Sequence, residues 1–185
     1  MKITQLPSLV REALYLVFCL LFVWVCAPFE ICLPFSPVPI VLQSNAIIFC
    51  AVLLGSRLAT LNAALFVALG ILGFPIWASG ASGWSIFIGP TGGYLFGYII
   101  GSLATGLIAE YRKPPTLARD FIAMLLGLVV IYAFGFAWLT QFVEPSAAFI
   151  KGVLPFIPGD CIKLVFFVLL LKRLPLGRFK AKENV

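Results

Sequence analysis

Two ionisable residues stand at the entrance of a strongly apolar run near the C-terminal end of the chain. The stretch PFIPGDCIK (residues 155–163) places Asp160 and Lys163 three residues apart, directly before LVFFVLLLKR. Residues i and i+3 share a helix face, so the ammonium group can neutralise the carboxylate. Charged side chains in membrane helices are costly, and they usually face the bundle interior or a cavity. This pair is therefore the first candidate for binding a polar ligand.

A purely structural role for the same pair is also open. Pro158 and Gly159 predict the start of a helix, which would put Asp160 in its first turn. A carboxylate there accepts backbone N–H bonds and faces the positive end of the helix dipole. Lys163 would then extend its ammonium group to the membrane interface. Capping and ligand binding are two interpretations that the local sequence does not separate.

Further candidates lie in the stretch GFPIWASGASGWSIFIGPTGGYLFGY (residues 73–98). Trp77 and Trp84 flank a Gly/Ser segment and are candidates for the apolar walls of a ligand site, with Ser79 as a hydrogen-bonding partner. A belt of aromatic residues at the membrane interface is the alternative. The turn GPTGG precedes a helix, so its backbone N–H groups predict a site for an anion or a carbonyl group. The candidates in this turn and at the helix start are Thr91, Gly92, Gly93 and Tyr94.

Three amide side chains complete the set of candidates. Gln43 stands where an apolar run begins, and its primary amide can donate and accept hydrogen bonds at once, which suits a urea or amide ligand. Asn45 and Asn62 lie within apolar runs and are predicted to form hydrogen bonds between helices.

Several kinds of chemistry are excluded by composition. The chain has no histidine, so a Ser-His-Asp triad and a histidine-containing zinc site are impossible. The five cysteines form no CxxC pair and are typical of small apolar membrane residues. GPTGG lacks the Lys-Ser or Lys-Thr of a nucleotide-binding loop. We expect no catalytic residues, no metal and no cofactor, and the sequence disfavours an intramembrane enzyme.

The overall composition is that of an integral membrane protein. Of 185 residues, 62% are hydrophobic and 11% are charged, whereas soluble domains have roughly 45–50% and about 25%. The net charge is +6, but the basic residues lie between or beyond apolar runs. Because they form no patch with interleaved aromatic residues, we expect no nucleic-acid partner.

Six apolar stretches predict an all-α protein with six transmembrane helices in one membrane domain (1–185). They cover approximately residues 13–27, 40–55, 58–73, 92–109, 121–142 and 159–171. With a cytoplasmic N-terminus, eleven of the thirteen basic residues fall in inside segments, as the positive-inside rule requires. Both termini are therefore predicted to be cytoplasmic, namely residues 1–12 and a basic tail (172–185) that would lie beside anionic lipid.

The connections on the outer side of this topology are unusual. Residues 27–39, 74–93 and 143–159 are apolar and rich in Gly or Pro. Irregular backbone at membrane depth is tolerated where protein buries it or where it lines a cavity. We expect these segments to fold back over the helices and cover an outward-facing substrate pocket. A stripe of small residues (Gly89, Gly93, Gly97, Gly101 and Thr105) predicts close packing against a neighbouring helix.

Three of these stretches together resemble the BioY family, the substrate-binding S components of energy-coupling-factor (ECF) biotin transporters. They are SPVPIVLQ (36–43), the segment 73–98 with GPTGGYL, and PFIPGDCIK, and the resemblance extends over about residues 28–172. It implies a six-helix protein of the bacterial cytoplasmic membrane that captures biotin from outside. It also implies a transmembrane coupling subunit and two ABC ATPases as partners.

The resemblance further implies that Asp160, Lys163, Gln43 and the GPTGGY turn take part in substrate binding. In biotin, two N–H donors and a carbonyl form the ureido ring, beside an apolar sulfur ring and a valerate carboxylate. Asp160 would accept ureido N–H bonds, and Lys163 would meet either the ureido carbonyl or the carboxylate. An Ala-x-x-x-Ala motif, common in the first helix of S components, is missing before Ala27, and Ala64-x-x-x-Ala68 offers a substitute. The alternatives are an S component for another vitamin, a solitary biotin transporter and a structural membrane scaffold.

Overall fold

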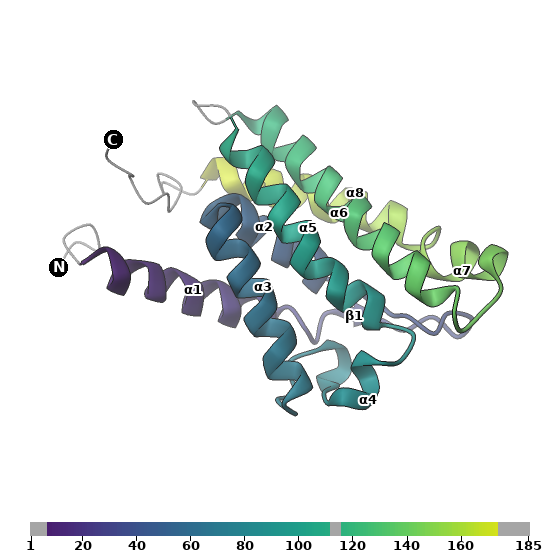
Figure 1. Cartoon of the computed structure of the whole chain (residues 1–185). Coiled ribbons are helices and arrows are strands. Elements are labelled where there is room, and N and C mark those ends of the chain that lie inside the picture. Colours follow the sequence, from purple (N-terminus) through teal and green to yellow (C-terminus); the bar gives the residue numbers. More distant parts are fainter. Residues whose placement is uncertain (1–6, 112–115, 174–185) are drawn as a thin grey trace.

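The structure is a computed structural model that describes residues 7–111 and 116–173 (Figure 1). Several basic residues used for the predicted orientation lie outside this part of the chain. They are Lys2, Arg112, Lys113, Arg178, Lys180 and Lys182, so the tail after Arg173 and the first half of segment 1–12 carry no structural account.

Each of the six predicted apolar stretches forms a helix. The helices are α1 (Ser8–Val25), α2 (Gln43–Leu54), α3 (Ser56–Ile71), α5 (Gly92–Glu110), α6 (Leu117–Leu139) and α8 (Phe156–Arg173). Four segments of the described chain are long and apolar enough to cross a membrane: Ser8–Val25, Gly92–Glu110, Leu117–Leu139 and Pro145–Arg173. The helices α2 and α3, of 12 and 16 residues, are shorter. The prediction of an all-helical protein is thus confirmed, and six crossings remain a prediction.

Short elements occupy the three Gly/Pro-rich connections. The first connection contains strands β1 (Glu30–Ile31) and β2 (Ile40–Val41), which pair antiparallel with Glu30 opposite Val41. The second contains a 3-10 turn, η2 (Ala78–Gly80), and the helix α4 (Trp84–Phe87), and the third contains α7 (Pro145–Gly152). In Figure 1, β1, α4 and α7 lie toward one end of the bundle, at the lower right. These elements position the loop residues that face the cavity described below.

The helices α5 and α6 lie side by side along their length and form the most extensive helix pair (Figure 1). Glycines of α5 make this approach possible. A Cβ added to Gly93 would lie 2.2 Å from Cβ of Trp138, and one added to Gly97 would lie 3.0 Å from Cα of Ile131. At Gly101 the same atom would lie 2.9 Å from the carbonyl oxygen of Gly127. The predicted small-residue stripe is therefore confirmed as a helix-packing surface at these three glycines, whereas Gly89 precedes α5 and lies near the backbone of Ile86.

The last helix begins earlier than the sequence predicts. The helix α8 starts at Phe156, so Pro158 is its third residue and Asp160 its fifth. Proline is tolerated in a first turn because the N–H group that it lacks has no partner within the helix there. The first turn of α8 contains no acidic residue, so the prediction that Asp160 caps this helix is wrong.

Candidate functional site

A cavity of about 420 Å³ lies among the outer connections and the adjoining helix ends. This volume falls within the range of roughly 300–1,000 Å³ that is usual for small-molecule sites. Its polar lining includes Gln43, Ser79, Thr91 and Asp160, and most of the remaining wall is aliphatic or aromatic. The cavity is buried at Asp160, which is 4% exposed, and open where lining residues are exposed, at Cys32, Pro37, Ser79 and Ser85.

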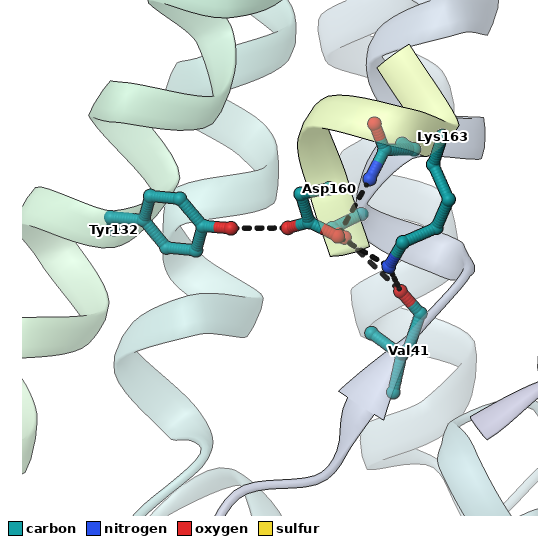
Figure 2. Close-up of polar contacts among 6 residues, drawn as sticks. Val41, Tyr132, Asp160 and Lys163 are labelled. Atoms are coloured by element: carbon teal, nitrogen blue, oxygen red, sulfur yellow. Dashed lines mark hydrogen bonds and ion pairs between the residues drawn. The ribbon is translucent and has the colours of Figure 1, made fainter. Parts of the chain in front are cut away.

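The Asp160 carboxylate is held at the buried end of the cavity by residues of two other helices and by a lysine of its own helix. The amide nitrogen of Asn45, on α2, donates a hydrogen bond of 3.0 Å to Oδ1. The hydroxyl of Tyr132, on α6, donates to Oδ2, and Lys163 forms an ion pair with Oδ1 (Figure 2). An ionised carboxylate has about four acceptor positions, so these three contacts leave Oδ2 able to accept another N–H group.

The ammonium group of Lys163 contacts the backbone of β2 as well as Asp160. Its Nζ atom lies 2.8 Å from the carbonyl oxygen of Val41 and pairs with Asp160 (Figure 2). Lys163 is not among the residues that line the cavity. In this structure it therefore neutralises Asp160 and fastens β2 to α8, and its contact with a ligand stays a prediction.

Aromatic side chains form the wall around the acidic end. Tyr132 stacks on Phe156 with ring centroids 6.4 Å apart, and Tyr94 meets Phe156 edge to face. The Tyr94 hydroxyl donates to the carbonyl oxygen of Gly152, at 2.7 Å, and thereby connects α5 to the end of α7. Such flat, rigid walls suit an apolar ring system.

The opposite wall of the cavity includes Trp77. This residue lies against Gly70 of α3, where an added Cβ would be 2.1 Å from Cε2 of the indole. Gln43 holds the same segment because its Nε2 donates a 2.7 Å hydrogen bond to the carbonyl oxygen of Ile76. The position of Trp77 thus depends on a glycine of α3 and on an amide of α2.

Six of the ten predicted site residues line the cavity, namely Gln43, Trp77, Ser79, Thr91, Tyr94 and Asp160. Besides Lys163, three others do not. Trp84 is 59% exposed and contacts Phe87 of α4. Gly92 and Gly93 pack against Trp138 of α6.

The GPTGG turn satisfies part of its own backbone. The N–H group of Gly92 donates to the carbonyl oxygen of Gly89, and that of Tyr94 donates to Thr91. These two groups are thus used within the turn, which leaves them unsuited to the anion site that the sequence predicts.

Four residues at the buried end were not among the predicted site residues: Asn45, Tyr98, Tyr132 and Phe156. Asn45 was predicted to bond between helices, which is confirmed, as it is for Asn62, whose Nδ2 donates to the carbonyl oxygen of Leu16. The partner of Asn45 is the acidic residue itself. Tyr98 stands one helical turn after Tyr94, and this spacing is the one sequence signal that pointed to it.

Comparison with known proteins agrees with these features. The profile of the BioY family matches residues 1–177. The chain belongs to the BioY family. A biotin transporter BioY from Thermotoga maritima is 39% identical over 145 residues, covering 78% of this chain and 85% of the relative. A probable biotin transporter BioY from Pyrococcus horikoshii is 36% identical with the same coverage.

A solved structure shares the fold. The crystal structure of the S-component for biotin from an ECF-type ABC transporter superposes with a TM-score of 0.84 at 29% identity. It covers 92% of this chain, and this chain covers 94% of it. Membership of a transporter family, together with several long apolar helices, identifies the chain as a multi-pass membrane protein and not as an enzyme. No group of His, Cys, Asp and Glu residues in the described chain is arranged to hold a metal ion.

Proposed function

We propose that this protein captures biotin in the cavity at its outer end and delivers it across the bacterial cytoplasmic membrane as the S component of an ECF-type transporter. The observation that carries the proposal is the Asp160 carboxylate, held at the buried end of a cavity with aromatic walls. The names of the related transporters and of the similar S-component structure support biotin as the substrate.

In this proposal a ureido N–H group of biotin donates to Oδ2 of Asp160. A hydrogen bond to a charged acceptor is worth about 1.5–3 kcal/mol, so the carboxylate contributes much of the affinity. The ring system of biotin lies against Tyr94, Trp77 and Phe156, while Gln43 and Thr91 offer further polar contacts. Lys163 acts through Asp160, because it pairs with the carboxylate and helps to fix its direction.

The test is a titration of the purified full-length protein with labelled biotin, using thiamine and riboflavin as competitors. Asp160→Asn should weaken biotin binding at least tenfold, because the amide presents an N–H group to one of the donors around it. Trp84→Phe is the matched control and should bind biotin normally, since Trp84 lies outside the cavity. Equal affinity of wild-type protein and Asp160→Asn would remove the ligand role of Asp160. Competition by thiamine or riboflavin alone would indicate a different vitamin.

The membrane arrangement that we propose has six crossings, made by α1, α2, α3, α5, α6 and α8, with both termini in the cytoplasm. The excess of basic residues on that side supports this orientation. The chain contains no nucleotide-binding loop, so the energy is proposed to come from a transmembrane coupling subunit and two ABC ATPases. Uptake of labelled biotin into cells that express this chain alone would instead support a solitary transporter.

A further inference from the structure

A carboxylate stands at each end of the cavity, in the wall at the buried end and behind the lining residues at the open end. At the buried end stands Asp160, and among the described residues that line the cavity it is the sole formally charged one. No Lys or Arg of the described chain lines the cavity, and the ammonium group of Lys163 is already bound to Asp160 and Val41. A ligand carboxylate therefore finds no cationic partner on the cavity wall.

The open end presents hydroxyl groups and, behind them, another carboxylate. Ser79 and Ser85 are exposed lining residues at this end. Ser79 donates a hydrogen bond to Oε1 of Glu30, and the thiol of Cys32 lies 3.8 Å from the same oxygen. The other oxygen of Glu30, Oε2, is buried and has no hydrogen-bond partner. The charged side chain that contacts Ser79 and Cys32 at the mouth is thus the carboxylate of Glu30.

These observations concern the acyl tail of the substrate and rest on the proposed biotin function. A biotin whose ureido ring is bound at Asp160 directs its valerate chain toward Ser79 and Ser85. There the free acid can accept a hydrogen bond from Ser85, since the one hydroxyl hydrogen of Ser79 is donated to Glu30. The acid gains no ion pair, and its charge is repelled by the carboxylate of Glu30. A neutral ester or amide accepts the same hydrogen bond from Ser85 without that repulsion, and the opening leaves room for its added group.

From this geometry we infer that the cavity recognises biotin through its ureido ring and accepts biotin esters and amides as well as the free acid. Glu30 is the residue that sets the affinity for a ligand with a charged tail relative to one with a neutral tail. The substrate class is then biotin with either a free or a neutral, substituted carboxyl group.

Competition against tritiated biotin on the purified full-length protein tests this inference. Biotinamide and biotin methyl ester should displace the label with inhibition constants within about threefold of that of unlabelled biotin. Glu30→Gln should strengthen the binding of biotin about three- to tenfold and leave that of biotinamide within twofold, because only the acid carries the repelled charge. Glu144→Gln removes an exposed carboxylate from the third connection, away from the mouth, and should change neither value.

The outcomes separate this inference from the proposed function. If the protein binds biotin tightly but binds biotinamide and the methyl ester more than about thirtyfold more weakly, the inference is overturned and the biotin function stands. An equal effect of Glu30→Gln on acid and amide would overturn the role of Glu30. Absence of any biotin binding would overturn both proposals. If Glu30→Gln does not fold, Cys32→Asp, which adds an acid at the exposed mouth and removes no hydroxyl donor, should weaken biotin about three- to tenfold and spare biotinamide.

Discussion

At the scale of single residues, the central feature is a buried carboxylate with three side-chain partners, two of them from other helices. Asp160 on α8 is contacted by Asn45 of α2, Tyr132 of α6 and, within its own helix, Lys163, which in turn reaches β2. A buried carboxylate needs hydrogen-bond and ion-pair partners, because the burial of an unpaired one costs several kcal/mol. The same contacts fix the direction in which the remaining acceptor position points. Structural support and ligand binding are therefore joined in one group.

Asn45→Ala tests this positioning. Removal of the amide donor should lower biotin affinity about five- to twentyfold, because Oδ1 loses one of its two partners and the carboxylate can turn. Asn62→Ala is the matched control: it also removes a buried amide that bonds between helices, but this amide contacts Leu16. It should lower the melting temperature without changing affinity. Equal losses of affinity in both variants would show that Asn45 acts through stability alone.

Lys163→Met tests the ion pair by its effect on stability. The two side chains are 19% and 6% exposed, and removal of one partner of a buried pair leaves an uncompensated charge. The free energy of unfolding should fall by about 3 kcal/mol. The double variant Asp160→Asn/Lys163→Met should recover at least half of this loss, as measured by thermal unfolding in detergent. A double variant as unstable as the single one would contradict the pairing argument.

The sequence could identify part of this site because charge within an apolar run is conspicuous. It pointed to Asp160 for that reason, and to Trp77 because two tryptophans flank an uncharged Gly/Ser segment. It could not identify Tyr132, which stands in the middle of a long apolar stretch and differs from its neighbours by a single hydroxyl. Which residues of α2 and α6 face Asp160 depends on the rotation of each helix about its axis, and close helix packing decides that rotation.

At the scale of elements, the pair α5 and α6 carries the cavity wall. Tyr94, Tyr98 and Tyr132 all come from these two helices. Their separation is set by glycines, so a small change in packing would displace the wall. The predicted start of α8 depended instead on the interpretation of Pro158. We took this proline as the boundary of the helix, although proline also fits inside a first turn. That ambiguity explains why the helix start was predicted three residues too late.

Gly93→Ala should disrupt the pair. The new methyl group would lie 2.2 Å from Cβ of Trp138 and 2.6 Å from the carbonyl oxygen of Phe134, and overpacking of this kind typically costs about 1–3 kcal/mol. Lower thermal stability and weaker biotin binding are both expected. Gly159→Ala on α8 is the control, since its nearest contact would be 3.9 Å away, at Cε of Lys163. It should be neutral or slightly stabilising, because alanine favours helix.

At the scale of the whole molecule, the three outer connections are tied to the helices and to one another. The Ser36 hydroxyl lies 2.7 Å from the carbonyl oxygen of Lys151, which connects the first connection to α7. Glu30 and Ser79 connect the first to the second. The composition of these segments predicted that they would cover the bundle. It could not predict these hydrogen bonds, because they join residues that only the folded backbone brings together.

Labelling of Cys32 tests the proposed orientation. This cysteine is exposed at the cavity mouth, whereas Cys19, Cys26 and Cys50 are buried. A membrane-impermeant maleimide should label it on intact cells, and saturating biotin should slow the reaction at least fivefold. Cys32→Ser should abolish the labelling; signal that persists would come from Cys161, the other exposed thiol. Labelling that requires permeabilised cells would place this face in the cytoplasm.

The placement of Trp77 against Gly70 has a spectroscopic consequence. The chain has four tryptophans, all within the described residues, and Trp77 is the one that lines the cavity. Biotin has no near-ultraviolet chromophore, so we expect a change in tryptophan emission on its arrival to come mainly from Trp77. The intrinsic fluorescence of the unlabelled protein therefore serves as an occupancy signal, and Trp77→Phe should remove that signal while three emitting residues remain.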